Sequence, residues 1–417
     1  MGLPAGWQTK RLGDVLQKTG TIDPRKNPDD QFEYIDVSSI SRKTFSIEKT
    51  SSLKGQDAPS RARRKVRTGD VLFATIRPTL QRIAIVPEML HGEVCSTGYF
   101  VLRPKEKVVD NRFLYHYLFT DTFMSAMESR QKGASYPAVN NGDVQEQLIS
   151  FPSLPEQKRL VTILDEAFAS IDQAVANTER NLANAREVFE SYLNGVFTRK
   201  GADWVDKKLG DICSIKHGFA FKSKFFSNTG KHIVLTPGSF YEKGGFRDRG
   251  KKTKYYLGEI PDTFILSKGD FLFAMTEQAA GLLGSSLIVL ASNRFLHNQR
   301  LGLVQINDET VWDNHFFHHQ FNTQYFRNSV QKTASGVKVR HTSPKKLAEI
   351  LISFPTKLSA QKKVSAQLNK MESETKHLES IYQKKRNALT ELKQSILHKA
   401  FTGELTQSPE QDLVKAC

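Results

Sequence analysis

The sequence predicts two tandem copies of a mixed α/β (α+β) domain, separated by a pair of long coiled-coil helices, in a chain that is a pseudo-two-fold internal repeat. Three observations support this fold class. Residues 155–198 and 359–402 each repeat apolar side chains at steps of three and four, as coiled-coil helices do. Short motifs of the first half return about 200 residues later. Strand-like apolar runs fill the stretches between the helices.

The first long helix is expected at residues 155–198, which contain no proline after Pro155. Pro155 suits the first turn of a helix, where its missing N–H costs nothing. At 1.5 Å per residue this helix would be roughly 66 Å long, and it could not bury its seam without a partner. Its predicted seam residues are Leu164, Phe168, Ile171, Val175, Leu182, Phe189 and Tyr192.

The partner is expected in the same chain, at residues 359–402. Seam positions of the first helix recur 204 residues later, as Leu164 does at Leu368. The two helices also end similarly, in GVFT at 195–198 and KAFT at 399–402. The predicted seam of the second helix is Leu368, Leu378, Tyr382, Leu389, Leu392 and Ile396.

The repeat extends through the domains. An LGD motif at 12–14 returns at 209–211, the strand-like 69–74 returns at 269–274, and LISFP at 148–152 returns at 351–355. We therefore predict a first domain at 1–152, a spacer helix at 153–200, a second domain at 201–355 and a second spacer helix at 356–403. The polar tail at 404–417 is expected to be disordered.

Within each copy, alternating or continuous apolar runs predict strands. They lie at 32–40, 70–76, 82–88 and 99–104 in the first copy, and at 232–238, 270–276, 285–291 and 301–307 in the second. Residues 111–129 and 313–331 are expected to form one helix each, with aromatic faces.

The chain carries a formal net charge of +16, and the excess is uneven. Lys and Arg exceed Asp and Glu by 5 up to residue 154 and by 8 in residues 201–354, whereas residues 155–200 have a net charge of −1. Basic domains on a near-neutral rod suggest a polyanion bound at two places. The alternative is a soluble protein whose high pI does not indicate a polyanionic partner.

Two features of the sequence predict where in the cell the protein is located. The N-terminus has no apolar leader stretch, and no run approaches the ~18 residues that span a membrane. The three cysteines, at 95, 213 and 417, are odd in number and unmatched between the copies, which predicts no disulfide framework. A cytoplasmic location is expected.

Catalytic signatures are missing. The sequence has no GxxxxGK[ST] loop, no GxSxG elbow and no HExxH pair, so the chain is not expected to be an enzyme. Asn27-Pro28 is followed by two aspartates and lacks the aromatic residue with which amino-methyltransferases hold a flipped base. His315, His318 and His319 have metal-like spacing, but no acidic or cysteine partner accompanies them in sequence, and no metal site is predicted.

Basic and amide side chains favour DNA binding, because Lys and Arg suit phosphates while Arg, Gln and Asn match base edges. They cluster around the strands at 70–76 and 270–276. The candidates are Arg61, Arg63, Arg64, Lys65, Arg77 and Arg82 in the first copy, and Lys222, Lys224, Arg247, Arg249, Lys251, Lys252, Gln278, Arg294, Gln299 and Arg300 in the second.

These features together resemble the specificity subunits of type I restriction–modification systems. The resemblance covers residues 1–403 and is most specific at 154–197, LPEQKRLVTILDEAFASIDQAVANTERNLANAREVFESYLNGVF. It implies two target recognition domains that read a bipartite, asymmetric double-stranded DNA target, on spacer helices packed as an antiparallel pair. It also implies two modification subunits carrying S-adenosylmethionine and two restriction subunits using ATP and Mg²⁺, with no cofactor in this chain.

Two alternatives to this reading are open at the level of sequence. The chain could serve a methyltransferase-only complex, or it could be a basic coiled-coil scaffold without sequence-specific DNA binding. A steep loss of affinity with salt, together with a sequence-dependent footprint, would separate a DNA reader from a scaffold.

Overall fold

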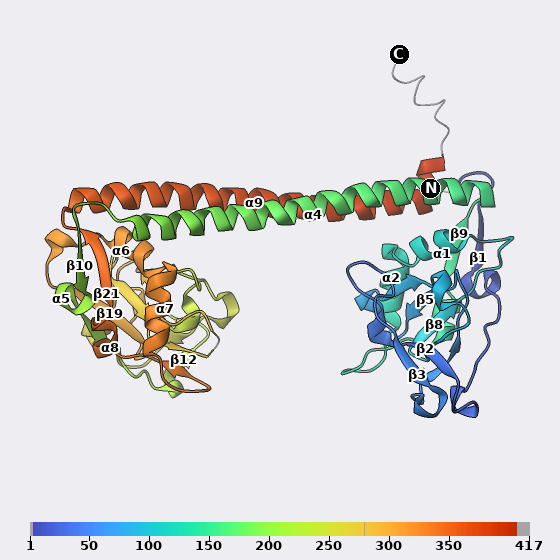
Figure 1. Cartoon of the computed structure of the whole chain (residues 1–417), viewed down its shortest axis with the longest axis horizontal. Helices are drawn as coiled ribbons and strands as arrows, with labels where there is room; N and C mark the ends of the chain where they lie inside the picture. The colour runs from blue at the N-terminus through green and yellow to red at the C-terminus, as the bar shows by residue number, and fades with distance from the viewer. Residues whose placement is uncertain (1–2, 279, 407–417) are drawn as a thin grey trace, which may run out of the picture. The chain divides into compact units, whose positions relative to one another are not determined.

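The computed structural model describes residues 3–278 and 280–406 (Figure 1). Its contacts divide the chain into two compact units, Met1–Thr178 with Lys384–Cys417 and Glu179–Gln383. Two long helices are shared between the units, namely α4 (Leu154–Arg199) and α9 (Leu358–Thr402). Unit 1 therefore holds the first domain with the start of α4 and the end of α9. Unit 2 holds the second domain with the other two helix segments.

The first domain is built from three small sheets. Strands β1 (Gln8–Arg11) and β9 (Leu148–Phe151) pair antiparallel and bring the two ends of the domain together. The central sheet has the order β6-β5-β8, and all four residues of β5 are buried. Its strands are β5 (Val71–Ala74), β6 (Ile83–Ile85) and β8 (Tyr99–Leu102); the third sheet, β3-β2-β7-β4, contains β2 (Gln31–Ile35), β3 (Ser51–Lys54), β4 (Ala62–Lys65) and β7 (Val94–Ser96).

The second domain repeats this plan. Strands β10 (Trp204–Lys208) and β21 (Leu351–Pro355) close it as β1 and β9 close the first. Its central sheet has the order β11-β19-β15-β17, and a second sheet has the order β12-β14-β13-β18. These strands are β11 (Cys213–His217), β12 (Phe226–Ser227), β13 (His232–Val234), β14 (Tyr255–Tyr256), β15 (Phe271–Ala274), β17 (Ser286–Ile288), β18 (Phe295–Leu296) and β19 (Leu301–Ile306). The predicted fold class, with its tandem repeat, is confirmed.

Each aromatic helix predicted as one piece is two helices, so that expectation was wrong. The breaks fall at Thr120 and Thr323, whose hydroxyls accept from the backbone N–H of Phe123 and Phe326, both at 3.3 Å. A threonine that caps a new helix satisfies one free N–H and ends the preceding helix. The resulting helices are α1 (Asn111–Tyr117) and α2 (Asp121–Arg130), and α6 (Asn314–Phe321) and α7 (Gln324–Thr333).

Three shorter helices complete the domains. A helix α3 (Asn141–Gln145) lies before β9, and α8 (Pro344–Ala348) lies before β21. Helix α5 (Leu209–Ile212) follows β10, at the place where a short 3₁₀ turn follows β1. The LGD motifs recognised as repeats occupy these last two turns, where the leucines are fully buried.

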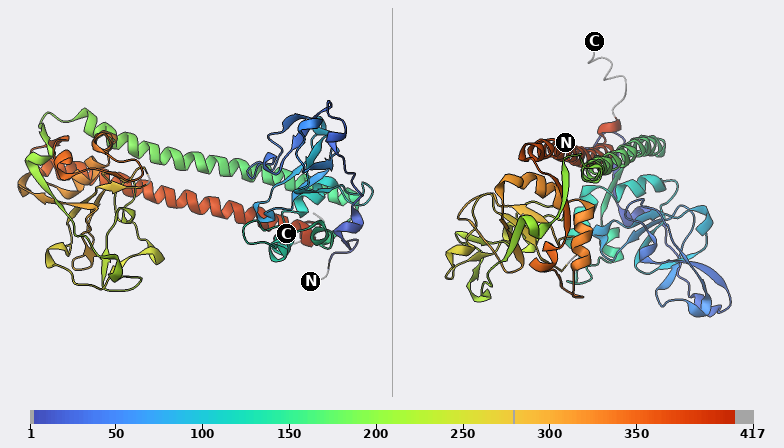
Figure 2. Two further views of the ribbon diagram at one scale, coloured as in Figure 1. Left: turned by 90° about the horizontal axis from the view of Figure 1, so that it is seen from below. Right: turned by 60° about the vertical axis from the view of Figure 1, so that its left-hand side comes forward.

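The long helices pair antiparallel within each unit (Figure 2). In unit 1, Lys393 Nζ lies 2.8 Å from Asp172 Oδ1. In unit 2, Arg186 Nε lies 2.6 Å from Glu379 Oε1. As the residue number rises along α4, the number of the residue that it contacts on α9 falls, so the two helices run antiparallel. The apolar contact in unit 1 is a small buried cluster of Leu164, Leu397 and Ala400.

The predicted heptad seams hold only in part. Leu164, Ile171 and Leu368 are buried, whereas Tyr192, Leu378 and Leu392 are 37%, 41% and 47% exposed. A strict seven-residue repeat drifts about 20° per heptad around a straight helix, so a long extrapolation rotates off the buried side. Leu193 and Leu397 are buried instead, each 29 residues, or about eight turns, beyond Leu164 and Leu368. The remaining predicted seam residues, which are Phe168, Val175, Leu182, Phe189, Tyr382, Leu389 and Ile396, are partly buried.

The expectation of a disordered tail was wrong for residues 404–406. Glu404–Thr406 form a short 3₁₀ helix, and the Leu405 carbonyl accepts a hydrogen bond from Arg159 Nη2 at 2.6 Å. Leu405 also packs against the core of unit 1. Residues 407–417 lie outside the described part of the chain. Across the described residues, no helix has both the length and the apolar character needed to cross a membrane.

Candidate nucleic-acid interface

Three loops of the first domain meet where β5 ends. The backbone N–H of Thr75 donates to the Gly98 carbonyl at 2.9 Å, and Val139 N–H donates to the Thr75 carbonyl at 3.0 Å. These bonds join residues 75–82, 96–98 and 132–138, which we call loop cluster 1. The cluster lies at one edge of the central sheet, because residues 75–82 join β5 to β6, residues 96–98 lead into β8, and residues 132–138, between α2 and α3, bond to the first of these loops.

Arg77 has a strained backbone conformation in loop cluster 1. Its φ of 51° lies in the left-handed region, which residues other than glycine rarely adopt. Its N–H donates to the Pro137 carbonyl at 2.7 Å, and its Nη2 donates to the Ser135 carbonyl at 3.2 Å. Its guanidinium carbon lies 5.0 Å from the ring centroid of Tyr136, which is 72% exposed. Such strain in an exposed arginine points to a functional role.

The second domain builds the same arrangement, which we call loop cluster 2, from residues 275–278, 298–300 and 335–342. The N–H of Met275 donates to the Arg300 carbonyl, and Thr342 N–H donates to the Met275 carbonyl, both at 3.0 Å. Strands β16 (Thr276–Glu277) and β20 (Arg340–His341) add an antiparallel pair. The equivalence of the bonds aligns Thr75 with Met275.

Glu277 organises loop cluster 2 from inside. It is only 3% exposed, and its Oε2 accepts from the backbone N–H groups of Gly281, Leu282 and Leu283 at 2.9–3.0 Å. Its Oε1 lies 3.4 Å from Arg340 Nη1. A buried carboxylate needs such partners, because an unpaired charge is costly to bury. Glu277 therefore fixes both the loop that follows β16 and the arginine on β20.

The two clusters carry different charges at matched positions. Where the first copy has Arg77 facing Pro137, the second has Glu277 facing Arg340. In the second copy the guanidinium thus lies on the opposite loop, where Arg340 is partly buried against Glu277. Gly98 and Arg300 also correspond, and a Cβ added at Gly98 would lie 2.5 Å from Val37 Cγ2, so the first copy has no room for a side chain there. The clusters share a scaffold and present different hydrogen-bonding groups.

Of the other first-copy candidates, Arg61, Arg63, Arg64 and Lys65 lie on or beside β4, whereas Arg82 lies in loop cluster 1 just before β6, and several of them are committed to internal contacts. Arg82 Nη1 donates to the Val37 carbonyl at 2.9 Å, and Arg63 Nη1 lies 3.3 Å from Asp23 Oδ1. Arg64 is partly buried. Arg82 and Arg63 therefore stabilise loops rather than present free guanidinium groups. Arg61 and Lys65 are exposed, as expected for a surface that meets phosphates.

The second-copy candidates fall into two groups. Gln278, Gln299 and Arg300 are exposed in loop cluster 2, as predicted for side chains that could reach base edges. The others surround the sheet that contains β13 and β14, where Lys224 lies over the ring of Phe225 and Arg294 over that of Phe295. That group comprises Lys222, Lys224, Arg247, Arg249, Lys251, Lys252 and Arg294, of which Arg249 alone is partly buried.

Sequence reasoning missed Tyr136 and Arg340. Both lie in loops that open with a matched glycine, Gly133 and Gly336, 203 residues apart and both with positive φ. That glycine pair was the signal available in the sequence, since the offset equals that of the following LISFP repeat.

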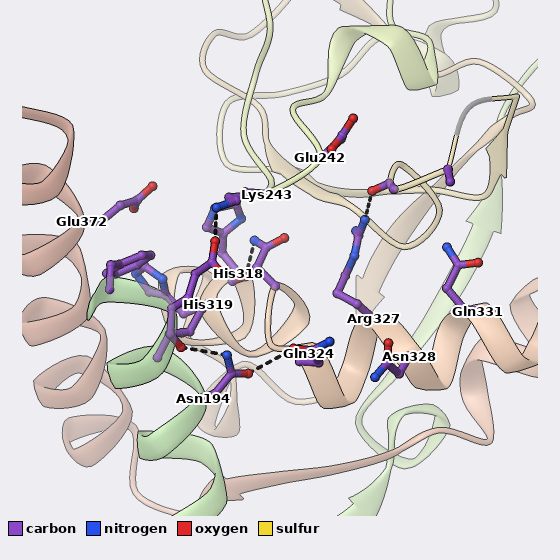
Figure 3. A pocket seen from close by; sticks show the side chains of 16 residues that line it. Asn194, Glu242, Lys243, His318, His319, Gln324, Arg327, Asn328, Gln331 and Glu372 are labelled. Atoms are coloured by element: carbon purple, nitrogen blue, oxygen red, sulfur yellow. Dashed lines mark hydrogen bonds and ion pairs between the residues drawn. The ribbon is translucent and has the colours of Figure 1, made fainter. Parts of the chain in front are cut away.

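A cavity of about 450 Å³ lies in unit 2 beside loop cluster 2 (Figure 3). Arg327 points from α7 to the Gly281 carbonyl and donates a hydrogen bond to it through Nη2. Burial lowers the pKa of this arginine to about 10, against the opposing charges of two nearby glutamates. The walls carry both charges, with Glu190, Glu242 and Glu372 opposite Lys243 and Arg327. The cavity does not select an anion.

Two histidines of α6, His318 and His319, make structural contacts within this unit. His318 Nδ1 lies 2.9 Å from Ser286 Oγ, and His319 Nε2 lies 2.7 Å from Asn369 Oδ1. Burial lowers the pKa of His318 to about 4. Among the residues that the structure describes, no group of three or more His, Cys, Asp or Glu side chains could hold a metal ion. Cys95 and Cys213 are buried free thiols, and Cys417 is outside the described residues.

Comparison with known proteins identifies the family. The model of the type I restriction modification DNA specificity domain matches residues 4–179 and again residues 201–387. The specificity subunit of the type I restriction enzyme EcoBI from Escherichia coli is 23% identical over 235 residues, 56% of this chain and 46% of that protein. The EcoKI specificity subunit from strain K12 is 26% identical over 335 residues, 75% and 69%. The chain thus spans less than half of the EcoBI subunit.

Solved structures agree over the whole chain. A chain from work on complex assembly and conformational transition of the type I R-M system has a TM-score of 0.83 at 27% identity, covering 96% of this chain and 99% of that one. The HsdS subunit from Thermoanaerobacter tengcongensis has a TM-score of 0.62 at 28% identity, covering 97% and 98%. The chain belongs to the family of type I restriction modification DNA specificity domain proteins.

Proposed function

We propose that this chain is the specificity subunit of a type I restriction–modification enzyme and that each domain reads one half of a bipartite, asymmetric DNA target. The observation that carries the proposal is the duplicated loop cluster on a duplicated family domain. Hydrogen-bonding groups that differ on a common scaffold are what two different half-sites require, because base edges in the major groove differ in their donors and acceptors.

The chain itself acts without catalysis in this proposal. Two modification subunits supply S-adenosylmethionine, and two restriction subunits supply ATP-driven, Mg²⁺-dependent cleavage, in the cytoplasm. The net charge of +16 supports attraction to DNA phosphates. Purified alone, the chain should neither bind S-adenosylmethionine nor methylate or cut DNA; binding of this cofactor by the isolated chain would contradict a purely recognising role.

Methylation-sensitive sequencing of a host genome that carries this chain and its partners tests the proposal directly. One measurement yields both half-sites and the gap between them. Replacing residues 1–152 with the corresponding domain of another specificity subunit should change one half-site and leave the other intact. A change in both half-sites would show that the two domains are read as one surface.

Two other outcomes identify the alternatives. Methylated sites in a host that leaves unmodified DNA uncut would indicate a methyltransferase-only complex. A coiled-coil scaffold would show no sequence-dependent footprint, and its DNA affinity would fall with salt equally for every sequence.

A further inference from the structure

Loop clusters 1 and 2 each end in a five-residue tip, tip 1 at residues 133–137 and tip 2 at residues 336–340. Lys132 and Ala138 exchange two backbone hydrogen bonds of 2.9 Å at the base of tip 1. Ser335 and His341 exchange bonds of 2.9 and 3.0 Å at the base of tip 2. Both tips begin with a glycine of positive φ, and a Cβ on Gly336 would lie 2.2 Å from the Val339 carbonyl. The tips are equivalent, closed and defined by the backbone.

Tip 2 presents apolar side chains to solvent. Val337 is 99% exposed and Val339 is 44% exposed. In tip 1 the matched positions hold Ala134 and the exposed Tyr136. An isolated exposed valine needs no explanation. An apolar side chain held at the same place in both copies, on a loop with a fixed backbone, indicates a contact surface.

The surroundings of tip 2 select a polyanion as the partner. Residues 335–346, SGVKVRHTSPKK, contain four lysines and arginines and no aspartate or glutamate. Arg340 is anchored at the base, with Nη1 3.4 Å from Glu277 Oε1 and Nη2 donating to the Gln331 carbonyl at 3.1 Å. An apolar tip flanked by cations fits a groove lined by phosphates, into which a two-stranded ribbon can enter.

We propose that tip 2 enters the major groove of the second half-site and that Val337 packs against the C5-methyl group of a thymine. This inference rests on the proposed function and assigns one base-edge contact within it. The thymine methyl is the apolar group that the major groove presents among hydrogen-bonding atoms, and small aliphatic side chains recognise it by contact.

The test replaces each thymine of the second half-site with deoxyuridine, one at a time, which removes the methyl group and keeps the base pairing. Affinity is measured for the full-length chain in complex with the modification subunits, for wild type, Val337→Ala and Leu290→Ala. Leu290 is a matched control, 59% exposed in the same domain outside tip 2. Val337 has so little contact with the rest of the chain that its truncation should leave the fold unchanged.

We expect one thymine at which deoxyuridine weakens wild-type binding about fourfold, which corresponds to about 0.8 kcal/mol for one methyl-sized group. At that position Val337→Ala should bind both bases equally, and Leu290→Ala should behave as wild type. The inference is overturned if no thymine is sensitive, if the half-site contains none, or if Val337→Ala remains sensitive. Equal weakening of all sequences by Val337→Ala also overturns it, since it would indicate a wedge or backbone contact. A wild-type complex with no sequence preference would instead refute the proposed function.

Discussion

Gln157 and Gln361 make the same three hydrogen bonds at the starts of α4 and α9. The Oε1 atom of Gln157 accepts from Asp110 N–H at 2.9 Å, and its Nε2 donates to the carbonyls of Val108 and Pro152 at 3.0 and 2.9 Å. Gln361 repeats this pattern with Asp313, Val311 and Pro355 at 3.0, 2.9 and 2.9 Å. Both glutamines are fully buried. Each glutamine therefore joins a domain to the N-terminal turn of the long helix that follows it.

Gln157→Leu should destabilise unit 1, and Gln361→Leu should destabilise unit 2. Leucine has a similar volume but leaves buried backbone groups without partners, at about 1–3 kcal/mol for each group. Hydrogen exchange followed by mass spectrometry would locate the loss, with faster exchange in the domain attached to the altered helix. Gln367→Leu, at an exposed position of α9, serves as the control. Equal effects of all three variants would rule out this role of the buried amides.

Leu193→Asp should be far more damaging than Tyr192→Asp, although heptad extrapolation predicts the reverse. Leu193 is 4% exposed and Tyr192 is 37% exposed. Burying a carboxylate without a partner should cost on the order of 3 kcal/mol or more, whereas the exposed position should change stability little. Urea unfolding of the two variants measures the difference. Greater damage from Tyr192→Asp would restore the strict heptad seam.

Unit 2 should lose stability on acidification through His318. Burial lowers the pKa of His318 to about 4 in the folded state, with His319, His315 and Lys376 also lowering it and Glu372 opposing them. The unfolded chain, with a pKa of about 6.5, therefore binds the proton first. The stability that the neutral imidazole contributes is present above about pH 6.5 and is lost as the pH falls toward 4, by about 3 kcal/mol in total.

The matched position in the first domain is Tyr115, which does not titrate in this range because burial raises its pKa to about 12. Thermal unfolding between pH 7 and pH 4 should therefore show unit 2 melting progressively earlier than unit 1. His318→Gln should reduce that dependence, and His297, whose pKa burial also lowers to about 4, should account for part of what remains. A pH profile unchanged by His318→Gln would assign the acid sensitivity to other groups.

Leu405→Ser should destabilise unit 1 by about 1–2 kcal/mol. Leu405 packs against the core of this unit, and its backbone carbonyl accepts from Arg159. The substitution removes apolar area from a partly buried site while keeping the backbone bond. Proteolysis with mass spectrometry would show earlier cleavage near the end of α9. A neutral result would mean that the Leu405 side chain contributes nothing to the stability of unit 1.

Arg77→Ala should relax discrimination at one base of the first half-site, at a cost of about 1–3 kcal/mol if the guanidinium meets a guanine edge. Tyr136→Ala should produce a weaker version of the same change, because Tyr136 only orients Arg77. Lys251→Ala, in the second domain, should instead weaken all sequences alike and reduce the salt slope by about one. Affinity measurements over a set of single-base variants at several salt concentrations distinguish these patterns.

The sequence by itself determined the repeat and the two long helices, and its motifs carried the resemblance to the family. Those features depend on local patterns, namely heptad spacing over more than forty residues and motifs that return at an offset of about 200. The sequence also identified Arg77, Gln278 and Arg300, which are exposed, as candidates. Basic and amide residues beside the end of a buried strand can be recognised without tertiary information.

Only the tertiary structure decided which candidate side chains are exposed and which are partly buried in contacts that support the loops. Arg82 and Arg77 look alike in sequence, yet Arg82 bonds to the Val37 carbonyl while Arg77 is exposed beside Tyr136. For the long helices, the sequence determined one feature and the tertiary structure another. Periodicity predicts that they exist, but small errors in the period accumulate over eight turns, so that Leu193 and not Tyr192 lies on the buried side.

Glu277 shows why the supporting contacts of the loops could not be predicted from the sequence. Its carboxylate joins loops that are up to 63 residues apart in sequence, and it is buried because those loops surround it. Local patterns record propensity and periodicity, which depend on neighbours along the chain. The partners of a buried charge are decided by which distant loops the sheet brings together, and that information exists only in the folded molecule.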